Sequence, residues 1–271
     1  MSAAILKVEG VAKTFVTGSG TVDALAETSI EVRQGEFVAV IGPSGCGKST
    51  LFNIIGGLDG ADRGRVLVDG KPIKGSHRDI GMVFQEESTF PWRTVIENVA
   101  FPLEVAGMGK REREEKAMRF VRLVGLDGFE RRYPAELSGG MRQRTALART
   151  LCAEPRILLM DEPFASLDEQ TRMLLGEKLL EICQALRQTT LFITHNLSEA
   201  IQLSDRVLVM SFRPGRIKRT VEIALPRPRS SDVIASEAFA SYLGIIWDEL
   251  KTEAAKGMQA QEAAWRDPAA A

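Results

Sequence analysis

The feature that most constrains the fold is an apolar run, Phe37–Ile41, that leads at once into a glycine-rich loop. A continuous apolar run of this length is typical of a strand that is buried on both faces of a parallel sheet. The loop, residues 42–49, matches the pattern G-x-x-x-x-G-K-[ST], and residues 49–55 continue as a helical segment. A buried strand, a tight loop and a helix in direct succession predict an α/β domain.

Later segments of the chain repeat the alternation of strands and helices. Short apolar runs that indicate buried strands recur at 157–160, 191–194 and 207–210, and helical segments near 169–187 and 198–203 separate them. This spacing predicts a parallel sheet with right-handed crossover connections.

The segments around this sheet have different patterns. Residues 5–8 and 29–33 alternate as half-buried strands do, and 65–70 and 80–85 are expected to form two further strands. Between about 94 and 152 the period becomes helical, which predicts a helical insertion inside the α/β domain. Residues 226–231 are predicted to be a linker, followed by a short helix near 233–256 and a frayed end.

Composition excludes several classes of protein. The net charge of −1 provides no long-range attraction to nucleic acid or anionic lipid. The longest apolar runs fall short of the roughly 18 residues that a membrane span needs. The start of the chain lacks a secretory signal pattern, and three cysteines show no pairing or metal-ligand spacing, so we expect a protein of the cytoplasm.

The glycine-rich loop carries the first chemical prediction, which is phosphate binding. Its glycines let backbone N–H groups converge on phosphate oxygens, Lys48 reaches the terminal phosphates, and Ser49 is placed to ligate Mg²⁺. The alternative is a strand–helix turn that holds a lysine by chance. Cys46 is read as a small filler, with a redox role as the alternative. The residues predicted to bind ATP here are Gly42, Pro43, Ser44, Gly45, Cys46, Gly47, Lys48, Ser49 and Thr50.

Two acids end the apolar run that begins at Ile157. Asp161 at the strand tip is expected to hold Mg²⁺, and Glu162 is placed to polarise an attacking water as general base. The alternative is that both acids only cap the following helix.

A second glycine pair opens a helix just upstream of these acids. Ser138, Gly139 and Gly140 would present unpaired N–H groups and the positive end of a helix dipole, which together form a second anion site. An ordinary helix N-cap at Ser138 is the alternative, but it does not explain the two glycines.

In this context the segment 137–143, Leu-Ser-Gly-Gly-Met-Arg-Gln, resembles the signature motif of ABC-type ATPases. The resemblance covers about residues 1–225. It implies a P-loop NTPase (RecA-like) core with an N-terminal antiparallel β subdomain and an inserted α-helical subdomain at about 86–155. It also implies a head-to-tail dimer that sandwiches ATP, with Ser138 to Gly140 capping the nucleotide held by the partner subunit.

The same resemblance assigns roles to single residues. Phe15 would stack on adenine, Gln85 would follow the metal and the phosphate, Ser166 to Asp168 would form the D-loop, and His195 would hydrogen-bond the γ-phosphate. Each has a plainer alternative as a core or surface residue, and Asn196 departs from the acid usual after that histidine. The predicted catalytic residues are Glu162, His195, Lys48 and Gln85, and the predicted Mg²⁺ ligands are Ser49, Gln85 and Asp161.

Within the family, the chain looks like the ATPases of nitrate, sulfonate and taurine importers. The segment 90–95, the segment 212–217 and Ile246-Trp247 carry this likeness. It implies a second ATPase subunit, a membrane permease docked near Trp92, an indirect periplasmic solute-binding partner, and a place on the cytoplasmic face of the inner membrane. The alternatives are a soluble ABC ATPase acting on nucleic acid or in cofactor assembly, and a degraded regulatory nucleotide binder.

Overall fold

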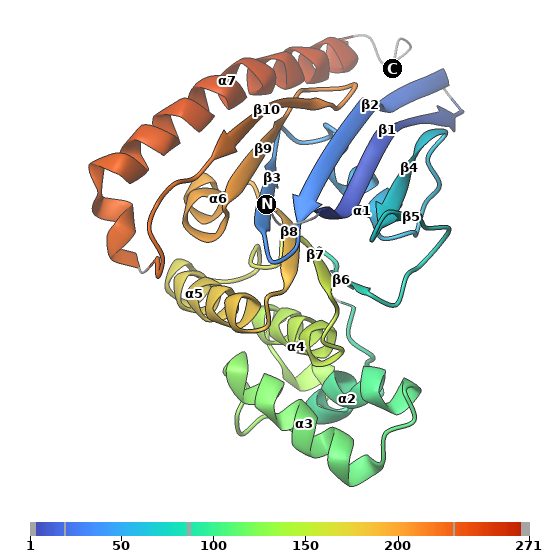
Figure 1. The fold of residues 1–271 in the computed structure, drawn as a ribbon, viewed down its shortest axis with the longest axis vertical. Coiled ribbons are helices and arrows are strands. Elements are labelled where there is room, and N and C mark those ends of the chain that lie inside the picture. The colour runs from blue at the N-terminus through green and yellow to red at the C-terminus, as the bar shows by residue number, and fades with distance from the viewer. Residues whose placement is uncertain (1–3, 19, 86–87, 230, 267–271) are drawn as a thin grey trace.

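The computed structural model describes residues 4–18, 20–85, 88–229 and 231–266, which form two sheets and their covering helices (Figure 1). The elements in chain order are β1 (Ala4–Thr17), β2 (Gly20–Arg33), β3 (Phe37–Ile41), α1 (Lys48–Ile55), β4 (Arg63–Val68), β5 (Lys71–Pro72), β6 (Ile80–Val83), α2 (Val95–Val105), α3 (Lys110–Leu123), η1 (Pro134–Glu136), α4 (Gly139–Cys152), β7 (Ile157–Asp161), α5 (Glu169–Ala185), β8 (Thr189–Ile193), α6 (Leu197–Leu203), β9 (Arg206–Met210), β10 (Ile217–Glu222), η2 (Ser231–Ala235) and α7 (Glu237–Arg266).

The larger sheet has the strand order β10-β9-β3-β8-β7-β6. From β9 to β6 all neighbours are parallel, as the alternation of strands and helices predicted, and β10 adds one antiparallel edge. Every residue of β3, β7 and β8 is buried, which agrees with the apolar runs within them, although β8 begins with two buried threonines, Thr189 and Thr190.

Alternate residues of these strands belong to two different hydrophobic cores. Phe37, Ala39 and Ile41 face the core that contains α2 to α6, whereas Val38 and Val40 face the core of α1 and the N-terminal sheet. This follows from the two-residue period of a strand, whose successive side chains point to opposite faces. The sheet is therefore the middle layer of the molecule.

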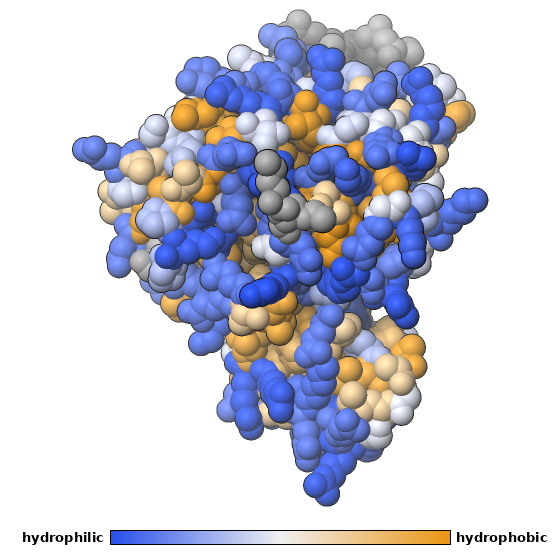
Figure 2. Space-filling view, viewed as in Figure 1, coloured by the Kyte–Doolittle hydropathy of each residue, from blue (hydrophilic) through white to orange (hydrophobic). Residues whose placement is uncertain are grey.

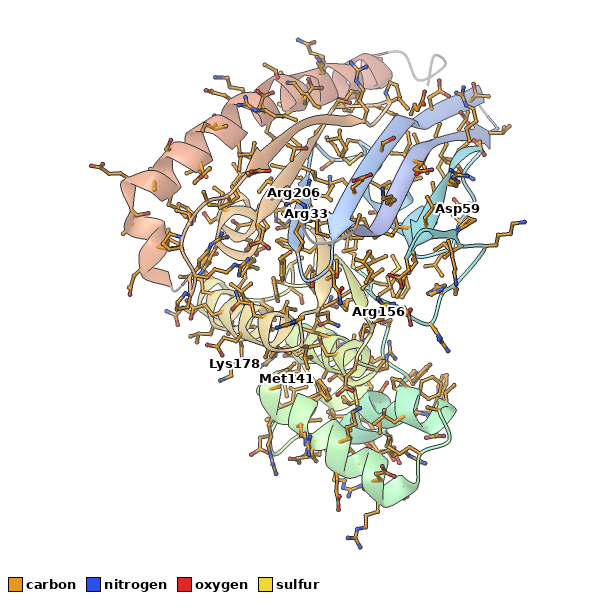
Figure 3. The ribbon with its side chains drawn as sticks, viewed as in Figure 1. Arg33, Asp59, Met141, Arg156, Lys178 and Arg206 are labelled. Atoms are coloured by element: carbon orange, nitrogen blue, oxygen red, sulfur yellow. The ribbon has the colours of Figure 1, made fainter. Side chains whose placement is uncertain are left out.

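The N-terminal sheet, in the order β2-β1-β4-β5, is antiparallel as expected, but its first two strands are longer than predicted. Only parts of β1 and β2 alternate regularly, because several register shifts interrupt their pairing. Arg156, at the start of β7, joins the two sheets through hydrogen bonds to Asp69 at 2.5 Å and Asp79 at 3.3 Å (Figure 3).

The helical insertion contains α2, α3 and α4 and projects from one end of the molecule (Figure 1). A capping box begins α2: the Thr94 hydroxyl accepts from the Glu97 amide, and the Glu97 carboxylate accepts from the Thr94 amide. Within the described residues, no helix is both long enough and apolar enough to cross a bilayer.

The C-terminal region differs from the prediction in two ways. The predicted linker is held against the core, because the buried Arg229 donates to the backbone carbonyls of Ile201, Ser204 and Ile223. The predicted short helix is instead α7, 30 residues long, which runs along the outside of β9 and β10 and buries Ile246 (Figure 1). Its apolar face packs on the core, which a charge-rich sequence read alone did not indicate.

Candidate active site

The predicted site residues of the α/β core follow four neighbouring parallel strands. The glycine-rich loop follows β3, His195 follows β8, Asp161 and Glu162 end β7, and Gln85 follows β6. Because β3, β8, β7 and β6 are adjacent and parallel, their carboxyl ends share one edge of the sheet. The fold thus brings these side chains to one edge of the sheet.

The loop between β3 and α1 is shaped by its glycines. Gly45 and Gly47 have positive φ angles of 72° and 97°, a region that L-residues with a side chain rarely adopt. A Cβ at Gly47 would lie 2.7 Å from the Ala24 carbonyl oxygen of β2, so the close approach of the two segments also requires glycine. The Lys48 ammonium donates to the carbonyls of Gly42 at 2.9 Å and Pro43 at 3.0 Å, which holds it over the loop.

Ser49 and Asp161 meet beneath this loop. The pKa of the Asp161 carboxylate is raised above its ordinary value chiefly by burial and, less strongly, by the charge of Glu162, while the neighbouring Ser49 hydroxyl opposes the rise. A buried carboxylate and a hydroxyl are oxygen donors of the kind that Mg²⁺ prefers. A bound divalent cation would compensate the buried negative charge, so these residues fit the predicted metal.

Glu162 and His195 are in direct contact. The Glu162 Oε2 lies 3.2 Å from the His195 Nδ1, and the backbone N–H of Glu162 donates to the Ile193 carbonyl at 3.0 Å. The His195 side chain is 63% exposed and that of Glu162 is 19% exposed, so the pair is open to an incoming ligand on the histidine side. The carboxylate can therefore accept a proton from a water that enters beside the imidazole.

Asn196, the departure from the family pattern, has a local structural role. Its side-chain oxygen accepts from the amides of Ser198 at 2.9 Å and Glu199 at 3.2 Å, which caps the N-terminus of α6. Thr194 donates to Glu199 at 2.6 Å and so orders the other side of the same turn. These contacts fix the backbone on both sides of His195.

Cys46 is fully buried in the loop, and burial raises the pKa of its thiol. Its sulfur lies 3.8 Å from the Lys48 nitrogen. A buried thiol with a raised pKa carries little thiolate and is a poor nucleophile. The geometry is that of a filler side chain.

The second glycine pair lies at the start of α4, on the helical side of the molecule (Figure 1). Ser138 is the N-cap, and its hydroxyl accepts from the Met141 amide at 3.3 Å. A Cβ at Gly140 would lie 2.9 Å from Leu167, so the glycine allows the predicted D-loop to pack against the helix start. Asp168, the last residue of that loop, caps α5 by accepting from the Thr171 amide at 2.9 Å.

Three polar residues of α4, to which the sequence analysis gave no individual role, connect this helix to the segment around Gln85. Gln143 donates to the Phe84 carbonyl at 3.1 Å, Thr150 to the Met82 carbonyl at 3.2 Å, and Arg149 to the Ser88 hydroxyl at 2.8 Å. Gln143 and Thr150 are two helical turns apart and lie on one face. Polar residues on a helix face that is otherwise apolar and buried could have indicated in the sequence that this helix binds another segment.

Phe15 lies on β1 opposite Val22 and is 37% exposed. The Lys13 ammonium is 5.1 Å from the centroid of its ring. The β1–β2 hairpin contacts the glycine-rich loop through Ala24, so the ring is on the element that borders the loop. Its partly exposed face is compatible with stacking, and the stacking itself stays a prediction.

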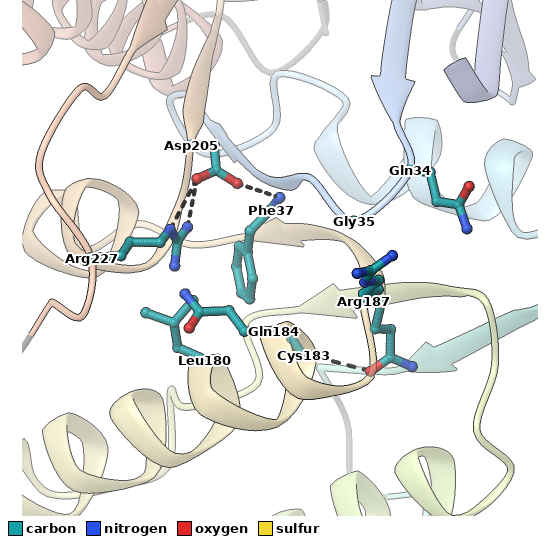
Figure 4. Close-up of a pocket in the computed structure, with 10 residues that line it drawn as sticks. Gln34, Gly35, Phe37, Leu180, Cys183, Gln184, Arg187, Asp205 and Arg227 are labelled. Atoms are coloured by element: carbon teal, nitrogen blue, oxygen red, sulfur yellow. Dashed lines mark hydrogen bonds and ion pairs between the residues drawn. The ribbon is translucent and has the colours of Figure 1, made fainter. Parts of the chain in front are cut away.

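A pocket of 460 Å³ lies at the opposite edge of the sheet, near the amino ends of β3 and β8 (Figure 4). There the Asp205 carboxylate accepts from the Phe37 amide at 2.9 Å and from Arg227 at 2.6 Å. None of the predicted site residues lines it.

Comparisons with known proteins agree with this geometry. The ABC transporter family model matches residues 25–165. An uncharacterized ABC transporter ATP-binding protein of Methanocaldococcus jannaschii is 51% identical over 254 residues, with 94% of each chain covered. The aliphatic sulfonates import ATP-binding protein SsuB of Bacillus cereus is 45% identical, with 86% of this chain and 91% of the relative covered.

A solved structure of the dimeric ATP-binding cassette MJ0796 bound to ADP and phosphate superimposes with a TM-score of 0.75. It is 32% identical, and the match covers 82% of this chain and all of that one. The fold is therefore that of an ABC cassette, which confirms the predicted P-loop NTPase core. The chain belongs to the ABC transporter family and is one of its ATP-binding, ATP-hydrolysing subunits.

Proposed function

We propose that this chain is the ATPase subunit of an importer that moves a small anion of the nitrate, sulfonate or taurine type through a separate membrane permease. The observation that carries the import assignment is the 45% identity to an ATPase named for aliphatic sulfonate import, over nearly the full length of both chains. The contact between Glu162 and His195 beside the glycine-rich loop supports active hydrolysis rather than a degraded site.

In the proposed mechanism, the glycine-rich loop and Lys48 bind the ATP phosphates. Ser49, Asp161 and Gln85 would hold Mg²⁺, which when bound neutralises phosphate charge. Gln85 is exposed at the end of β6, where a side chain is free to reach such a site. Lys48 and the loop amides stabilise charge on the transferring phosphoryl group.

Glu162 is proposed as the general base. Its carboxylate would accept a proton from water, while His195 at 3.2 Å orients the carboxylate and would hydrogen-bond the γ-phosphate through its other ring nitrogen. In this proposal the Nδ1 of His195 contacts Glu162, and the other ring nitrogen is used for the γ-phosphate.

The signature helix is proposed to act on a partner subunit. Ser138 lies at the exposed start of α4, in the helical insertion, whereas Lys48 starts α1 in the core. Helix N-termini attract phosphate through unpaired N–H groups and the helix dipole. A head-to-tail dimer would bring each signature to the other subunit's loop, and it would be a homodimer or a pair with a homologue.

The permease is proposed to dock around Trp92. The Trp92 side chain is 72% exposed and is therefore not part of the core of the helical insertion. Hydrophobic side chains gather among charged ones over the helical insertion (Figure 2). Phe90 packs on Trp92 at 5.6 Å and on Phe101 at 4.7 Å, and the Arg149 guanidinium lies 5.0 Å from the Phe90 ring. Movement of α4 would thus reach Trp92 through Arg149 and Phe90.

This arrangement implies the remaining partners. A subunit that docks on a permease lies at the cytoplasmic face of the inner membrane, and a periplasmic solute-binding protein delivers the anion without touching this chain. We expect no nucleic-acid partner, in keeping with the net charge of −1.

The test is reconstitution in liposomes with the membrane permease whose gene lies beside the gene for this chain. We expect the chain to co-purify with the permease, and its ATPase rate to rise when a binding protein loaded with an alkanesulfonate is present. Trp92→Ala should abolish co-purification without lowering ATP affinity, and Val105→Ala, which changes another hydrophobic residue with 72% exposure, serves as the control. Failure to bind the permease together with ATPase stimulation by DNA would overturn the proposal in favour of a soluble ABC ATPase.

A further inference from the structure

The segment between β9 and β10, residues 211–216, touches the glycine-rich loop from outside. The Arg213 guanidinium donates to the Gly45 carbonyl at 3.1 Å. Gly215 lies so close to the loop that a Cβ there would meet the Cys46 carbonyl oxygen at 1.9 Å. Two consecutive loop residues are therefore in contact with this segment.

The same segment is tied to the N-terminal sheet. Gly215 donates to the Ala24 carbonyl at 3.0 Å, and its own carbonyl accepts from the Ala26 amide at 2.9 Å. The segment thus lies between β2 and the loop and is held by backbone hydrogen bonds on its β2 side.

Helix α7 holds the other side of the segment through one carboxylate. Glu253 is 3% exposed, and its Oε2 accepts from the backbone N–H of Phe212 at 2.9 Å. Its Oε1 accepts from Lys256 at 2.9 Å and pairs with Lys218 at 3.2 Å. Although burial raises the pKa of Glu253, these hydrogen bonds lower it to about 2, so the group stays ionised throughout the physiological range.

One turn later, α7 comes near the loop itself. A Cβ at Gly257 would lie 3.2 Å from the Phe212 ring and 3.9 Å from Pro43. The glycine lets the helix, the Phe212 ring and the loop pack together. An unbroken set of contacts therefore runs from Glu253 through Phe212 and Arg213 to Gly45.

We infer that Glu253 and Arg213 are positioning residues for nucleotide binding: α7, through Phe212, orients Arg213, and Arg213 fixes the Gly45 peptide of the phosphate-binding loop. The loop needs such a contact because its glycines have large conformational freedom, which must be lost when phosphate binds. In a planar trans peptide the carbonyl and the following N–H point in opposite directions. A fixed Gly45 carbonyl therefore fixes the direction of the Cys46 N–H, which donates to the Pro43 carbonyl at 3.3 Å, so this turn of the loop is already ordered and the cost of ordering the loop is lower.

This inference needs only nucleotide binding and is independent of the transported solute. The residues act through the loop rather than on the reacting atoms, so their loss should change ATP affinity more than the rate at saturating ATP. Calorimetric titration of the full chain with ATP, and ATPase rates over a range of ATP, separate these effects.

We expect Arg213→Ala and Glu253→Gln each to weaken ATP binding about threefold to tenfold, the scale of one hydrogen bond, with a similar rise in KM and a nearly unchanged kcat. Arg213→Lys keeps a donor and should recover part of the affinity. The double variant should be no weaker than the worse single variant, because both residues serve one set of contacts.

Two matched controls separate positioning from stability. Arg216→Ala removes an exposed arginine from the same segment. Glu249→Gln removes an α7 carboxylate that pairs with Arg219 on β10 at 2.6 Å and shares Lys218 with Glu253, but its partners do not include the Phe212 amide. Both controls should keep wild-type ATP affinity, even where Glu249→Gln lowers the unfolding temperature as much as Glu253→Gln. Wild-type affinity in Arg213→Ala, or equal losses in all four variants, would overturn the inference.

Discussion

At the scale of single residues, the site separates two neighbouring carboxylates by environment. Asp161 is buried beside Ser49, whereas Glu162, one residue later, contacts the exposed imidazole of His195. Consecutive residues at a strand end point in different directions, so Asp161 faces the interior and Glu162 faces the exposed imidazole. Similar chemistry thus supports two different roles.

Replacing Glu162 by Gln tests the role of general base. The amide is nearly isosteric and can still contact His195, but it cannot accept a proton from water. We expect the ATPase kcat to fall about 100-fold or more, with ATP affinity within a few-fold of wild type. A coupled-enzyme assay and ATP titration measure the two quantities. Wild-type turnover in this variant would place the base elsewhere.

Replacing Asp161 by Asn tests the buried carboxylate. The pKa of Asp161 is higher in the folded protein than in the unfolded chain, so between these two pKa values the folded protein binds more protons. The free energy of unfolding therefore falls as the pH rises through this interval, and the ionised Asp161 lowers stability at neutral pH. Asp161→Asn should therefore raise the nucleotide-free unfolding temperature at pH 7, and the gain should shrink as the pH falls toward the ordinary Asp pKa. Mg²⁺-dependent ATPase activity should be lost. A lower unfolding temperature at pH 7 would contradict the argument.

At the scale of elements, the sequence predicted the strands and loops better than the contacts between segments that are far apart in the chain. The strands β3, β7, β8 and β9 could be identified from their apolar runs, because strands buried on both faces consist mostly of apolar residues. The contact of Gln143 with Phe84 and that of Glu253 with Phe212 join segments far apart in the chain, and no local periodicity encodes such pairs. The length of α7 was underestimated because its buried residues are few and widely spaced.

Arg229 shows why the predicted linker is fixed. Its guanidinium donates to carbonyls at the end of α6 and after β10, and burial lowers its pKa to about 10, which still leaves it charged at pH 7. Cations are favoured at the C-terminal ends of helices. The side chain therefore anchors the path from β10 to α7.

Arg229→Met should destabilise the protein by about 2–4 kcal/mol, because several buried carbonyls lose a charged donor. Urea unfolding followed by circular dichroism measures this change. Arg219→Met, which removes an exposed arginine from β10, should cost less than about 1 kcal/mol. Equal costs for the two variants would show that the buried hydrogen bonds contribute little.

At the scale of the whole molecule, the layers place far apart in the fold the two helix starts that are proposed to bind phosphate. Lys48 begins α1 beside the N-terminal sheet, and Ser138 caps α4 in the helical insertion (Figure 1). Figure 1 also shows α4 next to α5, whose N-cap Asp168 ends the D-loop that packs on Gly140. The start of α4 and the predicted D-loop are therefore in contact, and together they are proposed to meet a second subunit.

The dimer prediction follows from this surface and uses Glu162→Gln to prevent turnover. With ATP and Mg²⁺, the Glu162→Gln protein should sediment as a dimer, because each nucleotide would be held between one loop and the other signature. Adding Ser138→Arg puts a bulky cation at the exposed start of α4. It should abolish the dimer while ATP binding persists, because Ser138 is not in the loop of its own chain. Thr220→Arg, which also replaces an exposed hydroxyl residue by arginine but lies on β10, should leave the dimer intact. If Ser138→Arg instead abolished ATP binding to the monomer, the signature would serve its own chain's nucleotide and the head-to-tail arrangement would be wrong.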